Sequence, residues 1–262
     1  MNSRNLFSPL VAVIAVALLA SCDGLFSGVY DDPQDNRVAQ QGQLIVDATS
    51  WNNWYYIDFD SLAALAAAGD SVGLAKAQTN FTPYPIPRSL TGEQTESTTG
   101  IYTNWYDVFG KGLSVRERRA FTPTDPQPEP AHWSIAVHRN NVRTNNAAVI
   151  ETSYTSIDQL PEQSADFSGS DMKADEWDDA DVWVDQTQMI QGIVGCQGIK
   201  INKVLSSWLT ISLPPIPPAF TSNSHVFLIR FSNGKYAAVQ LENYMNAAGT
   251  KCWLTINYRY PY

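Results

Sequence analysis

The chain has 262 residues and a formal net charge of −9, with 26 acidic side chains against 17 lysines and arginines. An acidic protein repels phosphate groups, so this composition argues against binding to nucleic acid. Hydrophobic residues make up 44% of the chain, which is enough apolar material for a large core.

Residues 1–21 predict a lipoprotein signal peptide. Arg4 supplies a positive charge, an apolar run extends from Leu10 to Ala20, and small residues precede Cys22. The apolar run is too short to span a bilayer comfortably, and the sequence LASC at 19–22 has the form of a bacterial lipobox. We expect Cys22 to be acylated and to become the mature N-terminus. The alternative is an ordinary cleaved signal followed by a chance cysteine.

Residues 22–42 are acidic and polar, a composition that predicts a flexible tether. The folded part is expected to comprise residues 43–262 as a single domain, because no internal repeat and no second hydrophobic span follows. Two cysteines remain in this part, Cys196 and Cys252. In an exported protein they are expected to form a disulfide, and two separate thiols are the alternative.

The first elements of the folded part are expected to be strands, followed by one helix. Residues 43–59 are dense in aromatic and β-branched side chains and are interrupted by a turn-like stretch at 51–53. A short alanine-rich helix follows, with Ser61 as its N-cap and Gly69 as its stop. Two long proline-bearing segments then flank an aromatic patch at 101–113, and long loops of this kind are usually functional or disordered.

The C-terminal part is expected to contain only strands. A strand at 208–213 ends before a proline tract, and residues 226–244 predict a hairpin whose turn is Asn233-Gly234. Residues 251–260 supply a further strand. Short links imply antiparallel pairing, so we predict an all-β fold: one antiparallel, sandwich-like domain with one short helix and long loops.

The segment 132–145, HWSIAVHRNNVRTN, allows two interpretations. Alternation places Trp133, Ile135 and Val137 on one face of a strand and His138 on the other, and the same series continues into charged residues. The favoured interpretation is structural: His138, Arg139 and Arg143 form hydrogen bonds and ion pairs with neighbouring strands. The alternative is that an arginine binds an anionic group of a ligand.

Three segments resemble, in order, the HmuY family of surface haem-binding lipoproteins. They are LIVDATSWNNWYYIDF at 44–59, WSIAVHRNNVRTNNAAVIETSYTSIDQL at 133–160 and SNSHVFLIRFSNGKYAAVQLENYMNAAGTKCWLTINY at 222–258. The resemblance implies a β-rich single domain that is tethered to the outer membrane and faces the cell exterior. It also implies that this domain captures haem for a partner transporter of the TonB-dependent kind.

The resemblance also implies where iron ligands would lie. A family pattern has two axial histidines, one before a strand that opens with tryptophan and one five residues after that tryptophan. Counted from Trp208, the second position is Leu213, which cannot bind iron. The histidines His132, His138 and His225 all fall outside the ligand positions, and the resemblance makes His138 part of a fold signature.

Relatives within the family replace these histidines with methionines, and a thioether is an established haem ligand. Met189 is the first candidate for an iron ligand here and Met172 the second. For each methionine the alternative is packing in the core, where flexible apolar side chains fill gaps. The aromatic stretch from Tyr102 to Phe109 is a candidate wall of the haem pocket. We therefore expect methionine-ligated haem if haem is bound.

Other chemistry has little support in the sequence. The motifs HExxH, GxSxG and CxxCH and a phosphate-binding loop are all absent, so we do not expect an enzyme. The acidic run at 171–185 lacks the regular spacing of a calcium loop, and a solvated loop is favoured over a calcium site. The rival function is a lipid-anchored adhesin or glycan-binding module without haem, which would use exposed aromatics around Tyr102, Trp105 and Tyr106.

Overall fold

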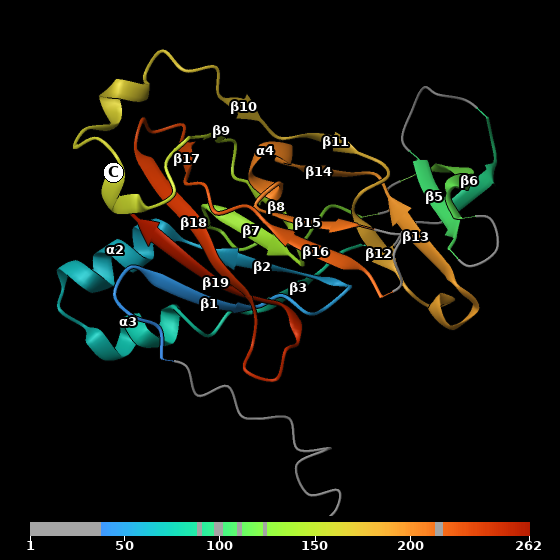
Figure 1. Ribbon diagram of the computed structural model, residues 1–262, viewed down its shortest axis with the longest axis horizontal. Helices are drawn as coiled ribbons and strands as arrows, with labels where there is room; N and C mark the ends of the chain where they lie inside the picture. The colour runs from blue at the N-terminus through green and yellow to red at the C-terminus, as the bar shows by residue number, and fades with distance from the viewer. Residues whose placement is uncertain (1–37, 88–90, 97–101, 109–111, 123–124, 213–216) are drawn as a thin grey trace, which may run out of the picture. The chain divides into compact units, whose positions relative to one another are not determined.

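The structure is a computed structural model that describes residues 38–87, 91–96, 102–108, 112–122, 125–212 and 217–262 (Figure 1). The side chains of Thr91, Tyr102 and residues 112–116 are also left undescribed. The expected signal peptide at 1–21, Cys22, most of the tether at 22–42 and the ligand position Leu213 therefore lie outside the described residues.

The largest sheet has six antiparallel strands, and hydrogen bonds join β1 to β19, β19 to β18, β18 to β17, β17 to β9 and β9 to β10 (Figure 1). The N-terminal strand thus pairs with the C-terminal one. In the order of the sheet, the strands are β1 (Gln43–Asp47), β19 (Lys251–Arg259), β18 (Tyr236–Met245), β17 (Phe227–Arg230), β9 (Ala148–Glu151) and β10 (Lys173–Ala174).

Two further sheets have four and five strands, and two short ribbons complete the strand content. The four-stranded sheet contains β3 (Pro83–Pro85), β2 (Asn53–Ile57), β7 (Ile135–His138) and β8 (Asn141–Thr144). The five-stranded sheet contains β12 (Trp183–Asp185), β13 (Ile193–Gln197), β5 (Tyr102–Asp107), β6 (Gly112–Phe121) and β4 (Thr91–Gln94). The ribbons are β11 (Glu176–Asp178) with β14 (Ile199–Ile201) and β15 (Leu209–Ser212) with β16 (Ala219–Ser222).

The predicted all-β class is confirmed, because every pairing in the described sheets is antiparallel and the helices are few and short. Among the described residues, the α-helices are α2 (Phe59–Ala67), α3 (Ser71–Ala77) and α4 (Lys203–Ser206), and the 3₁₀ turns are η1 (Ile157–Gln159), η2 (Ser164–Phe167) and η3 (Met189–Gln191). No helix among the described residues is long and apolar enough to cross a membrane.

The prediction of a single helix capped by Ser61 is wrong in two respects. Helix α2 begins earlier, because the carboxylate of Asp58 accepts a hydrogen bond from the backbone N–H of Asp60, 3.1 Å away, and so caps the first turn. The hydroxyl of Ser61 donates to the same carboxylate. After Gly69 the chain starts a second helix, α3, which is capped by Asp70.

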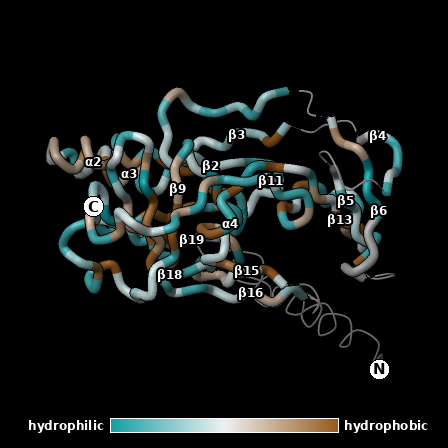
Figure 2. Tube along the Cα trace, turned by 90° about the horizontal axis from the view of Figure 1, so that it is seen from above, coloured by the Kyte–Doolittle hydropathy of each residue, from teal (hydrophilic) through white to brown (hydrophobic). Residues whose placement is uncertain are grey.

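The main core is formed by buried side chains of the six-stranded and four-stranded sheets. Leu44, Leu254 and Phe227 of the first sheet and Ile57 and Ile135 of the second belong to one cluster of buried side chains. In Figure 2, hydrophobic (brown) stretches of the chain gather near β9 and β19. Burial of side chains of this size supplies most of the stabilisation of such a fold.

The predicted hairpin at 226–244 is confirmed as β17 and β18, with Phe227 opposite Val239. Gly234 in its turn has a φ angle of +81°, which glycine adopts without steric cost. The segment 132–145, in contrast, is not one long strand. It folds back as the β7–β8 hairpin, in which His138 faces Asn141 and Arg139 turns the chain with a φ angle of +54°.

Candidate functional site

A cavity of about 820 Å³ lies in the described part of the chain, and its volume is typical of cofactor sites. Its walls come from the β7–β8 turn, the end of β5, the segment around β12 and β13, α4, and the β15–β16 ribbon. Most of the wall is apolar or aromatic, and the side chains with this character are Trp51, Tyr106, Val108, Trp183, Met189, Val194, Ile201, Leu209, Ile211, Pro217, Pro218 and Phe220.

Arg139 forms a cationic part of the cavity wall. Its guanidinium carbon lies 4.1 Å from the centroid of the Trp51 ring, and Nη1 donates a hydrogen bond to the carbonyl oxygen of Thr49 at 2.9 Å. Trp51 in turn stacks on Trp183, with ring centroids 6.5 Å apart and an interplanar angle of 24°. No carboxylate of the described residues forms an ion pair with Arg139. Burial lowers the pKa of the guanidinium without removing its charge near neutral pH.

A second charged region of the wall is neutralised internally. Lys203 Nζ lies 3.2 Å from Oδ2 of Asp178 and 3.4 Å from Oε1 of Glu176. Asp181 lines the cavity beside this group, and burial together with the neighbouring Asp178 carboxylate raises the pKa of Asp181. The Lys203 charge is therefore shared between two carboxylates, which leaves Arg139 as the cation of the described wall without an acidic partner.

None of the three histidines lines the cavity. His138 is fully buried, with Nδ1 3.0 Å from the carbonyl oxygen of Asn53 and Nε2 3.3 Å from that of Trp183. Burial lowers the pKa of His138 to about 4, so its imidazole is neutral and structural. His132 is exposed and borders a smaller hollow, and His225 lies 2.6 Å from the carboxylate of Glu151.

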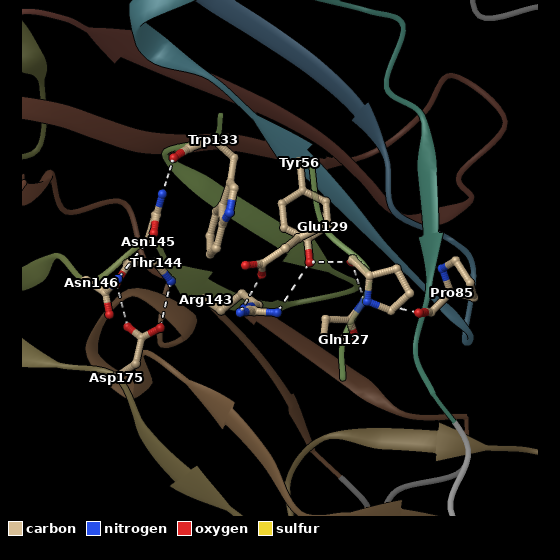
Figure 3. Close-up of polar contacts among 11 residues, drawn as sticks. Tyr56, Pro85, Gln127, Glu129, Trp133, Arg143, Thr144, Asn145, Asn146 and Asp175 are labelled. Carbon is tan, nitrogen blue, oxygen red and sulfur yellow. Dashed lines mark hydrogen bonds and ion pairs between the residues drawn. The ribbon is translucent and has the colours of Figure 1, made fainter. Parts of the chain in front are cut away.

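Arg143 has the structural role that the sequence favours (Figure 3). Its Nη2 lies 3.1 Å from Oε2 of Glu129, and its Nη1 donates to the hydroxyl of Tyr56 at 3.3 Å. The guanidinium also lies over the ring of Trp133, 4.9 Å from its centroid. Next along β8, the hydroxyl of Thr144 donates to Asp175. Arg143 is thus paired and lies outside the cavity wall, unlike Arg139.

The structure separates the two methionine candidates. Met189 begins the η3 turn, lines the cavity and keeps 41% of its surface exposed. Met172 does not line the cavity; it packs against the buried cluster of Leu160, Val226 and Leu228, so its position fits the packing alternative. Leu213 is undescribed, but Ser212 and Pro217, on either side of the undescribed segment 213–216, both line the same cavity as Met189.

The aromatic stretch from Tyr102 to Phe109 is largely strand β5 rather than a loop. Tyr106 is buried and lines the cavity, as expected for a wall, whereas the Trp105 indole packs on the backbone of Gly195. An added Cβ at Gly195 would come within 2.9 Å of that ring. The side chain of Tyr102 and the whole of Phe109 lie outside the described residues. The adhesin alternative requires exposed aromatics at these positions, but Tyr106 is buried and Trp105 is half-buried on the opposite face of β5.

The expected disulfide is not formed. Cys196 lies in β13 of the five-stranded sheet and Cys252 near the start of β19 in the six-stranded sheet, and both are buried thiols. Cys196 packs in a cluster with Tyr106 and Val194, whereas Cys252 interacts electrostatically with Arg139, so each thiol has surroundings of its own that the sequence does not reveal. The acidic run at 171–185 likewise forms no metal site: no group of three or more His, Cys, Asp or Glu side chains among the described residues could hold a metal ion.

Sequence reasoning missed Trp51, Trp183 and Phe220 as cavity residues. Trp51 lies in the turn-like stretch before β2, Trp183 begins β12 and Phe220 lies in β16. Each one is an aromatic residue in or beside a short strand, a pattern that predicts core as readily as a ligand site. Only the approach of segments more than 130 residues apart in the sequence brings Trp51 and Trp183 together.

The model of the HmuY protein family matches residues 50–258. The chain belongs to the HmuY family. The predicted resemblance is thereby confirmed, and the match covers the cavity residues from Trp51 to Phe220. Among curated proteins, none matches the chain.

Solved HmuY-like structures share this fold. A proposed HmuY-like haem-binding protein of Bacteroides vulgatus ATCC 8482 is 28% identical with a TM-score of 0.54, over 84% of this chain and 91% of its own. A proposed lipoprotein of Bacteroides fragilis NCTC 9343 is 25% identical with a TM-score of 0.54, over 84% and 89%. The apo HmuY analogue of Tannerella forsythia is 20% identical with a TM-score of 0.51, over 82% and 93%, and supports the fold alone.

Proposed function

We propose that this protein is a lipid-anchored protein of the outer membrane that binds haem at the cell exterior and passes it to a partner transporter of the TonB-dependent kind. The observation that carries the proposal is the cavity of about 820 Å³ with aromatic walls in a chain of the HmuY family. The 28% identical relative, itself a proposed haem-binding protein, supports the same ligand class. We propose a binding protein and not an enzyme.

The residues of the cavity fit a porphyrin in size and in chemistry. The volume lies in the range of cofactor sites, and flat rings such as Trp51, Trp183 and Phe220 supply apolar surface against which a porphyrin face is buried. Burial of apolar surface contributes roughly 25 cal/mol per Å², so contact with these rings favours binding of a large aromatic ligand. Haem, when bound, would supply an iron centre that a protein side chain can bind.

Met189 would hold the iron of haem through its thioether. It is the one sulfur or imidazole side chain of the described residues that lines the cavity. The neighbouring segment 213–216 reads Leu-Pro-Pro-Ile and offers no side chain that binds iron. We therefore propose coordination by Met189 without a second protein ligand from this segment. Met172, which packs against another cluster, is set aside as a ligand.

A haemin titration followed through the Soret band tests the function. We expect saturable binding by the wild-type protein. Phe220→Ala, which removes a half-buried wall residue, should weaken haemin binding several-fold because apolar contact area is lost. Phe167→Ala is the matched control, since Phe167 is also half-buried but packs on the cluster around Leu160, outside the cavity wall. Absence of saturable binding by the wild type would refute the haem function.

A further inference from the structure

Arg139 is the feature of the cavity that haem burial and Met189 leave unexplained. A cation that is partly withdrawn from water normally has an anionic partner, because removing it from solvent is costly. Arg139 has instead the face of Trp51, at 4.1 Å, and one backbone carbonyl, at 2.9 Å. Its partners among the described residues therefore leave its positive charge without an anionic counterpart.

The geometry points to Arg139 as the carboxylate-binding residue of the cavity: we propose that it recognises an acidic side group of an amphipathic ligand and that it discriminates against neutral analogues. The inference rests on the proposed function, since it names the group of the porphyrin class that this residue would bind. For haem the group is a propionate.

Three structural facts support this assignment. Trp51 holds the guanidinium by stacking, so the planar fork is oriented before any ligand arrives, and Trp183 supports Trp51 in turn. Among the described residues, only Thr49 accepts a hydrogen bond from the fork, through its carbonyl oxygen and Nη1, and the remaining N–H groups keep their capacity to donate. The left-handed φ angle of Arg139 places this side chain at the apex of the β7–β8 turn, on the cavity wall.

The other charged residues of the wall do not offer the same site. Lys203 is shared between Asp178 and Glu176, so a carboxylate that approached it would compete with two acidic groups. Asp181 would repel an anion in its charged form. The chain has a net charge of −9, so the electrostatic potential of the whole protein does not attract a carboxylate. Recognition of the ligand carboxylate therefore depends on the local charge of Arg139.

The experiment compares two ligands, which differ in their carboxylates, on the wild type and on variants of Arg139. Iron protoporphyrin and its dimethyl ester are titrated into the wild-type protein, Arg139→Gln and Arg139→Lys. Arg143→Gln is the matched control, because this arginine of the same hairpin is paired with Glu129 and lies outside the cavity wall. Both ligands present the same porphyrin face and the same iron, so only the carboxylate contact differs between them.

We expect Arg139→Gln to weaken binding of the diacid about tenfold and to leave binding of the diester nearly unchanged, because only the diacid loses a charge-assisted hydrogen bond. Arg139→Lys should recover part of the loss, and Arg143→Gln should affect neither ligand. Esterification should weaken binding to the wild type by a similar factor, a result that does not depend on how any variant folds.

Three outcomes overturn the inference, and the third differs from the first two in also refuting the proposed function. Equal affinity of the wild type for diacid and diester, with saturable binding of both, would leave the haem function intact and remove Arg139 as a carboxylate site. The same conclusion follows if Arg139→Gln weakens both ligands equally, because the residue would then only support Trp51. Failure of the wild type to bind either porphyrin would refute the proposed function together with this inference.

Discussion

The Nδ1 atom of His138 lies 3.0 Å from the carbonyl oxygen of Asn53, at a position with no solvent exposure. Asn53 begins β2 and His138 ends β7, so the contact joins the ends of two paired strands. On the other side of the ring, Nε2 lies 3.3 Å from the carbonyl oxygen of Trp183 in β12. One neutral imidazole thus connects the four-stranded sheet to the aromatic wall of the cavity.

Acid should destabilise the protein through His138. Burial lowers the pKa of this group to about 4 in the folded state, whereas it is about 6.5 in an unfolded chain. Because the unfolded state then binds more protons, the contribution of His138 to stability is present above pH 6.5 and is lost as the pH falls toward 4. The adjacent Arg139 charge acts in the same direction. The loss should be on the order of 2–3 kcal/mol between pH 7.5 and 4.5.

Urea unfolding of the wild type and of His138→Gln at these two pH values measures the effect. Other groups also contribute to the pH dependence: hydrogen bonding to Asn223 lowers the pKa of the Glu151 carboxylate, so its contribution to stability is also lost as the pH falls. The informative quantity is therefore the difference between the two proteins. An equal decline in the free energy of unfolding for both would show that His138 does not carry the pH dependence.

Substitution of Met189 should affect haem binding, whereas substitution of Met172 should affect the stability of the fold. Met189→Ala should change the Soret spectrum and weaken haem binding, most clearly for ferrous haem, because a thioether favours the reduced iron. Met172→Ala should leave the haem spectrum unchanged and lower the free energy of unfolding by about 1–2 kcal/mol, since it removes half-buried apolar contacts. Parallel haem titrations and urea unfolding of both variants check this. An unaltered spectrum for Met189→Ala would exclude it as an iron ligand.

Cys196 and Cys252 should behave as two buried thiols. Both are buried and unbridged, and burial raises the pKa of the Cys252 thiol, which reduces its thiolate fraction. We expect little alkylation of the folded protein by iodoacetamide, and two added groups on residues 196 and 252 after unfolding in urea without reductant. Peptide mass mapping identifies the sites. A cross-linked peptide containing both residues would restore the disulfide expected from the sequence.

Cys22 should determine membrane association. It follows an apolar run and small residues at the end of the expected signal peptide, the arrangement that precedes lipidation. Two acyl chains anchor a protein stably, whereas a protein without them partitions into water. Cys22→Ala should therefore abolish labelling by radioactive palmitate and move the protein from the membrane to the soluble fraction. Fatty-acid labelling that persists in the variant would contradict the prediction.

Local sequence signals predicted the elements that depend on local chemistry. The β17–β18 hairpin follows from the Asn233-Gly234 turn between two apolar runs, and both strands form where expected. The β7–β8 hairpin was missed because its turn begins at Arg139, an arginine in a left-handed conformation that nothing in the local sequence announces. Helix α3 was missed for a related reason: its sequence, SVGLAKA, contains glycine and valine, which are poor helix formers.

Local sequence signals do not predict which distant residues come together to form the cavity. Met189 was selected from the sequence and lines the cavity, whereas its partners Trp51 and Arg139 come from distant parts of the chain. Arg139 and Trp51 are 88 positions apart in the sequence. They come into contact only because β2 and β7 are neighbours in one sheet. Tertiary pairing of this kind also decides that Cys196 and Cys252 lie in different sheets.

The stack of Trp51 on Trp183 gives the protein an optical probe of its own. Both indoles line the cavity, while other tryptophans, such as Trp54 and Trp208, are enclosed in the core. The emission of an indole shifts to shorter wavelength when water leaves its surroundings. A ligand that fills the cavity will therefore alter the fluorescence of this pair even if the ligand is colourless, and replacing Trp51 and Trp183 with phenylalanine will remove the response. Ligands that contain no metal and no porphyrin can thus be surveyed on the unlabelled protein.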